Sequence, residues 1–268
     1  MDRDRKISIM GIVNLTDDSY FAGSRCADLR AAIDRIAVLV EEGADIIDIG
    51  ACSTRPGSLP VGAEEEWRRL EPVLKAFREN FQNVTLSIDT YWASVVEKAF
   101  AIAGPFIVND ITAGEADSEM LPTVGRLRLK YVAMHMRGVP ENMQSLTDYN
   151  DVVEDVLEYF RNFSEKAEMH GIKDWILDPG FGFAKTLEQN YALMKGLEKI
   201  KSEMLPRPVL VGISRKSMIY RRLGITPEES LPATQALHMA ALERGADILR
   251  VHDVAEAART VSLFKMLS

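Results

Sequence analysis

The chain has 268 residues, 47% of them apolar, which is enough to bury a full hydrophobic core as one domain. Its 32 basic and 40 acidic residues give a net charge of -8, which disfavours nucleic acid and anionic membranes as partners. Only two cysteines, no signal-peptide pattern and no run of about eighteen apolar residues predict a cytoplasmic protein.

Eight short apolar segments have the length and the β-branched content of buried parallel strands. In chain order they are residues 7–14, 44–50, 84–89, 105–110, 130–135, 174–178, 208–214 and 246–252. None of them is long enough to be a typical helix.

Segments with helical spacing follow these strands, at residues 27–43, 63–80, 91–104, 118–128, 149–171, 186–200, 230–245 and 253–267. In the first, Leu29, Ile33, Ile36 and Val40 form an apolar stripe, and Gly43 marks the end of the helix. Eight strands alternating with eight helices predict an α/β fold, a (β/α)₈ TIM barrel that occupies residues 1–268 as a single domain.

The active site of such a barrel lies at the carboxyl ends of its strands. Polar residues occur at every one of these ends: Asn14, residues 53–58, Asp89, Asn109 with Asp110, His135 with Arg137, Asp178, Ser214 to Lys216, and Arg250 with His252. A single residue of this kind is explained well by capping or by solvation of a loop. Eight strand ends in register predict a shared site.

Several of these residues also have a structural interpretation. Asp89 fits an N-cap, Asp178 fits a turn cap, and Lys216 fits a solvated loop lysine. Asn109 and Asp110 are adjacent, so strand alternation directs only one of them inward.

The last strand ends in RVHDV (250–254), and its Arg250 and His252 have the spacing that places both on one face. A helix is predicted directly after them, with Asp253 as its N-cap. Phosphate sites in barrels often use the loops after strands seven and eight. The pair therefore predicts an anion site.

Eight motifs occur in order along the chain: NLT (14–16), STRPG (53–57), SIDT (87–90), VNDI (108–111), MHMRGVPENMQ (134–144), LDPGFGF (177–183), GISRKS (212–217) and ILRVHDV (248–254). Together they resemble the motif set of the dihydropteroate synthase family, over about residues 7 to 266. The resemblance implies condensation of (7,8-dihydropterin-6-yl)methyl diphosphate with 4-aminobenzoate, giving dihydropteroate and diphosphate. It also implies a homodimer.

The resemblance further implies a role for each matching residue. The pterin-binding positions are Asp89, Asn109, Asp178 and Lys216. Thr54 contacts the substrate near its anionic end, and Arg55 helps to close the site. Asn14 is the ligand of Mg²⁺, and Ser217 offers its hydroxyl and backbone N–H to the carboxylate of 4-aminobenzoate.

The implied reaction is SN1-like and needs no protein nucleophile. Arg250, His252 and Lys216 stabilise the leaving diphosphate, whereas Asp89 and Asp178 favour positive charge on the ring. This arrangement sorts opposite charges to opposite ends of the substrate. Arg250→Ala is then expected to lower turnover at least about tenfold and to change pterin affinity little.

The first loop departs from the family pattern, with Asp17 in place of the usual proline and Phe21-Ala22 in place of Ser-Asp. Three alternatives to the synthase remain. One is a methyltetrahydrofolate-using methyltransferase, and another is a Schiff-base lyase with Lys185 or Lys216 as nucleophile. The third is a catalytically silent pterin-binding protein.

Overall fold

The computed structural model describes residues 5–15, 25–52, 61–138 and 142–267. Eight strands form a parallel sheet: β1 (Ser8–Asn14), β2 (Ile46–Gly50), β3 (Thr85–Asp89), β4 (Ile107–Asp110), β5 (Lys130–Met134), β6 (Trp175–Asp178), β7 (Leu210–Val211) and β8 (Ile248–Val251). Their order in the sheet is β6-β5-β4-β3-β2-β1-β8-β7. A parallel bridge between Leu177 and Val209 joins the two outer strands and closes the barrel.

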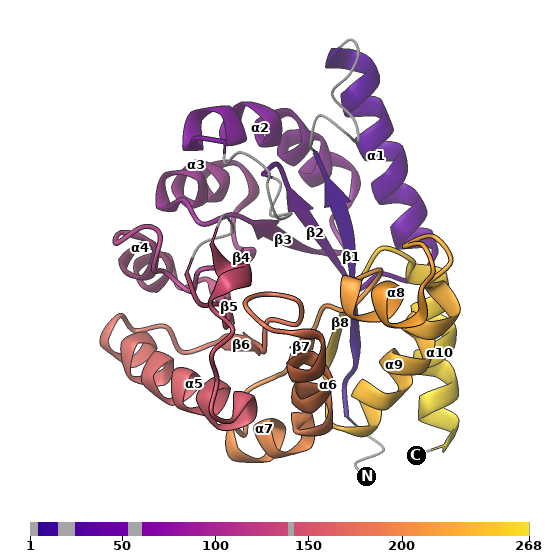
Figure 1. Cartoon of the computed structure of the whole chain (residues 1–268). Coiled ribbons are helices and arrows are strands. Elements are labelled where there is room, and N and C mark those ends of the chain that lie inside the picture. Colours follow the sequence, from indigo (N-terminus) through magenta and orange to yellow (C-terminus); the bar gives the residue numbers. More distant parts are fainter. Residues whose placement is uncertain (1–4, 16–24, 53–60, 139–141, 268) are drawn as a thin grey trace.

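The helices lie outside the strands (Figure 1). They are α1 (Arg25–Glu41), α2 (Ala63–Asn80), α3 (Ala93–Ala103), α4 (Met120–Leu127), α5 (Val152–Met169), α6 (Leu187–Lys195), α7 (Leu197–Glu203), α8 (Ser217–Leu223), α9 (Leu231–Glu243) and α10 (Val254–Leu267), with a 3-10 turn η1 (Met143–Ser145). The prediction of a (β/α)₈ barrel is confirmed.

The predicted strands and helices are all present, and two features of the helical layer differ from the sequence analysis. The segment predicted as one helix over 186–200 is divided at Gly196 into α6 and α7. A Cβ on Gly196 would lie 2.5 Å from Cγ2 of Val153 on α5, so this junction packs more closely than any other residue would permit. The seven-residue helix α8 was not among the predicted helices, because a segment with only Met218 and Ile219 buried has little periodicity.

Strand alternation determines which residues enter the barrel. One apolar cluster fills its interior, made of Met10, Ile46, Ile107, Val132, Ile176, Leu210 and Ile248. In β2, Ile46 belongs to this inner cluster, whereas Ile47 and Ile49 pack between the sheet and the helices. Asp48 therefore shares the inward face with Ile46, one step closer to the carboxyl end of the strand.

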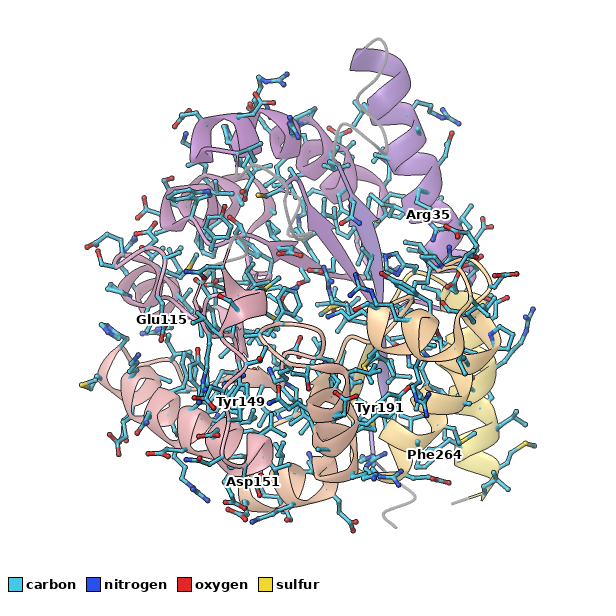
Figure 2. The ribbon with its side chains drawn as sticks, in the orientation of Figure 1. Arg35, Glu115, Tyr149, Asp151, Tyr191 and Phe264 are labelled. Carbon is cyan, nitrogen blue, oxygen red and sulfur yellow. The ribbon has the colours of Figure 1, made fainter. Side chains whose placement is uncertain are left out.

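The helices also hold the loops around the barrel mouth. Arg35 of α1, labelled in Figure 2, donates from Nη2 to the backbone oxygen of His252 at 2.7 Å. Tyr191 of α6, also labelled there, donates its hydroxyl to the backbone oxygen of Met218 on α8 at 3.0 Å. These contacts fix the loops after β7 and β8 against the outer layer.

Candidate active site

The carboxyl ends of the strands bring the predicted polar residues to one edge of the barrel. Asn14, Asp89 and Asp178 are the last residues of β1, β3 and β6. Parallel pairing places Asp89 beside Asn109, and Met134 beside Asp178. A single polar rim therefore exists, as the sequence predicts.

Asp48 is the residue of this site that sequence reasoning missed. Its side chain is completely buried, and it accepts hydrogen bonds from Oγ of Ser87 at 2.6 Å and from Nδ2 of Asn109 at 3.0 Å. Nε of Arg250 donates to the same carboxylate at 2.7 Å. The available signal was a lone acid inside the buried strand IIDIG, because buried acids need partners.

Arg250 lies between two carboxylates. Besides Asp48, its Nη2 donates to Oδ2 of Asp89 at 2.7 Å, and 22% of its side chain is exposed. The sequence analysis expected Arg250 at the end of the substrate opposite the acids. The structure corrects that expectation, since the guanidinium contacts Asp89, one of the acids expected to bind the pterin, directly.

Charges at this edge influence each other because they are buried. Burial raises the pKa of Asp89, and the Arg250 guanidinium acts in the opposite direction. Burial alone would lower the pKa of Arg250, but Asp48 and Asp89 together raise it, so Arg250 stays charged. Burial also raises the pKa of Asp178, opposed first by Lys216.

Asn109 and Asp110 point in opposite directions, as strand alternation requires. Asn109 reaches Asp48 in the barrel mouth, whereas Asp110 accepts a 2.6 Å hydrogen bond from the Tyr131 hydroxyl and further bonds from Thr112 and the N–H of Gly114. Asp110 thus organises the loop after β4, and Asn109 is the residue that faces the site.

Asp178 begins a tightly folded loop, residues 178–186. Its Oδ1 accepts the N–H of Gly180 at 2.8 Å, and Gly180 has a φ of 72° that favours glycine. Nζ of Lys216 donates to the backbone oxygen of Phe181 at 2.5 Å and lies 4.4 Å from the centroid of the Phe183 ring. Lys216 is therefore fixed against this loop and is not a freely solvated lysine.

Lys216 precedes α8 as its N-cap residue. Burial lowers the pKa of its ammonium to about 8, while the charge of Asp178 acts to raise it. Lys216 is positively charged at neutral pH and loses that charge at mildly alkaline pH.

His252 is held by Ser214, a buried residue after β7. Oγ of Ser214 accepts the backbone N–H of His252 at 3.2 Å and pairs with its ring Nδ1 at 3.1 Å. The hydroxyl and Nδ1 can each act as the donor in this contact, and in either case the contact orients the imidazole ring.

Asp253 directly precedes α10, the position expected of an N-cap. Its carboxylate receives hydrogen bonds from Nε of Arg215 at 3.0 Å and from Nη2 at 2.6 Å. This ion pair ties the loop after β7 to the start of α10.

For the remaining predicted site residues, the structure gives at most their position and burial. Asn14 and Ser217 are half-buried, at the end of β1 and at the first residue of α8. Thr54 and Arg55 lie outside the described residues, as do Asp17, Phe21 and Ala22 of the unusual first loop. In the described part of the chain, no cluster of three or more His, Cys, Asp or Glu could hold a metal ion.

Comparison with known proteins decides the family. A family model described as pterin binding enzyme matches residues 10–252. A dihydropteroate synthase from Synechocystis sp. is 40% identical over 261 residues, which is 96% of this chain and 89% of that protein. One from Clostridium beijerinckii is 40% identical over 258 residues, covering 95% of this chain and 92% of the relative. The chain belongs to the dihydropteroate synthase family.

Solved dihydropteroate synthases have the same fold. One from Clostridium difficile, determined in the presence of pteroic acid, gives a TM-score of 0.91 at 36% identity and covers 100% of this chain and 98% of its own. Another, from Xanthomonas albilineans with 4-aminobenzoic acid, gives 0.90 at 37% identity and covers 99% and 94%. The family resemblance predicted from the motifs is confirmed.

Membership of the dihydropteroate synthase family argues against two alternatives from the sequence analysis, the methyltransferase and the Schiff-base lyase. The methyltransferase alternative has no support, because the relatives matched over nine-tenths of the chain are synthases. The Schiff-base alternative, with Lys185 or Lys216 as nucleophile, has no support for the same reason. Within the described ranges, no helix is both long and apolar enough to cross a bilayer.

Proposed function

We propose that this dihydropteroate synthase family member condenses (7,8-dihydropterin-6-yl)methyl diphosphate with 4-aminobenzoate, releasing diphosphate in folate biosynthesis. One observation carries the proposal: acids, an amide and cations from β2, β3, β4, β6 and β8 converge on the same strand-end edge. The reaction needs these groups, since it binds a polar heterocycle and separates an anion from it.

The pterin cradle consists of Asp89, Asn109, Asp178 and Lys216. A pterin has an amidine-like edge of donors and acceptors, and two carboxylates with one amide complement it. Because Nδ2 of Asn109 already donates to Asp48, its Oδ1 is directed away from that carboxylate and can accept from the ligand. A hydrogen bond to a charged group contributes about 1.5–3 kcal/mol, so several acting together give micromolar affinity.

Arg250, His252 and Lys216 stabilise the leaving group. The carbon–oxygen bond to diphosphate breaks with both electrons on oxygen, and positive charge develops on the pterin methylene. Preorganised cations and N–H donors that face that oxygen stabilise the transition state. Asp89 and Asp178 stabilise the cationic pterin, and Arg250 contacts Asp89 directly.

The second substrate supplies the new bond. The amine of 4-aminobenzoate is neutral at pH 7, so its lone pair forms the carbon–nitrogen bond without a protein base, and one proton then leaves to solvent. Ser217 binds the substrate carboxylate through its hydroxyl and backbone N–H. Thr54 contacts the substrate near its anionic end, and Arg55 helps to close the site. The reaction uses no covalent enzyme intermediate.

Asn14 is the proposed ligand of Mg²⁺. An amide oxygen at the end of β1 suits this ion, which prefers oxygen and keeps several waters. When bound, the ion would neutralise charge on the diphosphate.

The proposed enzyme is a cytoplasmic homodimer. Two cysteines in 268 residues are compatible with a reducing compartment. Both assignments rest on the family resemblance and the composition.

The decisive assay incubates the chain with the dihydropterin methyl diphosphate, Mg²⁺ and radiolabelled 4-aminobenzoate. Labelled dihydropteroate is the expected product. Pterin binding without turnover would instead support the silent binding protein, and a borohydride-trapped adduct with a carbonyl substrate would support the lyase.

A further inference from the structure

Lys185 is a buried cation that the proposed chemistry does not use. It lies in the loop 178–186 and only 4% of it is exposed. Its Nζ is 2.9 Å from Nδ1 of His135, 3.0 Å from the backbone oxygen of Gly180 and 3.1 Å from that of Phe183. An ammonium has three donors, and three acceptors surround this one.

His135 acts as an acceptor in this group. Burial lowers its pKa well below the usual value, and the charges of Lys185 and Arg137 lower it further. The imidazole is therefore neutral, and its Nδ1 accepts from Lys185 while Nε2 carries the proton. Tyr159 packs edge-on against the ring at 4.9 Å between centroids, which keeps the imidazole in place.

The loop connects Lys185 to Asp178 through Gly180. Lys185 donates to the backbone oxygen of Gly180, and the N–H of Gly180 donates to Asp178. A Cβ at Gly180 would lie 1.9 Å from the backbone oxygen of His135 and 3.3 Å from Nζ of Lys185. The backbone at Gly180 therefore packs closely against both His135 and the Lys185 ammonium, and leaves no room for a side chain.

The charges around Asp178 come from several elements. Lys216, Arg250 and Lys185 face it as cations, and Asp89 faces it as an acid. Lys185 in turn faces Asp178, Lys216 and Arg137. Burial lowers the pKa of Lys185 to about 7, with Asp178 opposing, so Lys185 is charged throughout the acidic range in which Asp178 takes up its proton.

We propose that Lys185 is a positioning residue for pterin recognition, which holds the loop 178–186 in shape and keeps Asp178 negatively charged. It acts through Asp178 and does not touch the substrate. The choice of a pterin as ligand rests on the proposed function.

The test measures the affinity for pteroic acid by calorimetry between pH 5 and 8.5. In the wild type, affinity falls on the acid side as the carboxylates of the cradle become protonated. Lys185→Met removes the cation, so we expect the midpoint of this fall to move to higher pH by about half a unit, which lowers the affinity about threefold on the acid side of the midpoint. At pH 8 the loss should be clearly smaller, and Lys185→Arg should restore the wild-type midpoint.

A matched control separates charge from loop geometry. Asn190 holds the same loop without a charge, since its Oδ1 accepts from the N–H of Gly182 at 2.6 Å and its Nδ2 donates to the backbone oxygen of Thr186 at 2.7 Å. Asn190→Ala should weaken binding equally at every pH, with no shift of the midpoint. If Lys185→Met does not fold, Lys185→Gln gives the same test, because an amide can donate without charge.

Two outcomes would overturn the inference: an unchanged pH midpoint in the neutral variants, or a loss of affinity that is equal at every pH, as in Asn190→Ala. Failure of the wild type to bind pteroic acid is a different result. It would count against the proposed function.

Discussion

Arg250 in β8 donates its Nε to the buried carboxylate of Asp48 in β2, at 2.7 Å. Since β1 lies between these two strands in the sheet, the ion pair joins strands that are not direct neighbours, at the carboxyl end of the barrel. The same carboxylate accepts Nδ2 of Asn109, so one acid orients both a cation and an amide of the proposed substrate site.

Asp48→Asn should lower kcat/KM by about tenfold or more, because one neutral amide cannot hold both Arg250 and Asn109 as the carboxylate does. Steady-state kinetics with both substrates would measure this. Ser87→Ala is the control, since it removes only a neutral partner of Asp48 and should change kcat/KM about threefold at most. Equal effects of the two variants would contradict the orienting role of Asp48.

Arg250→Ala should reduce turnover by about 10²–10³-fold and should also weaken pterin binding. The second effect arises because Asp89 loses its closest cation and its pKa rises further. Calorimetry with pteroic acid, compared with single-turnover rates, separates the two effects. Unchanged pterin affinity would mean that the bond to Asp89 does not persist in solution.

The pH dependence of kcat/KM should show an alkaline limb near pH 8. Lys216 has its pKa lowered to about 8, so its charge is complete below that pH and is lost as the pH rises through it. Lys216→Arg keeps the charge at all these pH values and should move the limb upward, even if its maximal rate is lower. A limb that stays in place in Lys216→Arg would assign it to another group.

Glu66→Gln should stabilise the protein at pH 8 relative to wild type. Glu66 is buried on α2, and burial raises its pKa to about 8, which the Thr90 hydroxyl offsets only in part. The folded state then binds more protons than the unfolded state between pH 4.5 and 8, so wild-type stability falls as the pH rises through that window.

Urea unfolding at pH 5 and pH 8 would give the free energies of unfolding of the wild type and of Glu66→Gln. The free energy of the variant relative to wild type should be about 2–4 kcal/mol more favourable at pH 8 than at pH 5. Glu65→Gln is the control. Arg68 and Arg69 lower the pKa of Glu65 to about 2, so removal of that charge should give no such change between pH 5 and 8. A constant difference for Glu66→Gln would contradict the buried, protonated state.

The strands could be predicted because their apolar runs have the composition and length of buried β-structure. The polar rim at their carboxyl ends could be predicted from the residues at which these runs end. Asp48 was missed because its role depends on Arg250, 202 residues away along the chain, and periodicity does not show such pairs. Lys185 was considered only as a nucleophile, since the three acceptors around it, one of them His135 after β5, come together only in the folded protein. The close approach of Gly196 to Val153 of α5 likewise exists only in the folded protein.

The most direct test of the mechanism is rapid-quench measurement of diphosphate release with and without 4-aminobenzoate, in the wild type and in His252→Ala. If the groups at β7 and β8 drive bond cleavage, a single turnover should release diphosphate without the second substrate, and His252→Ala should slow that release about 10²-fold. Release that occurs only with 4-aminobenzoate, at a rate proportional to its concentration, would contradict leaving-group departure as the first step.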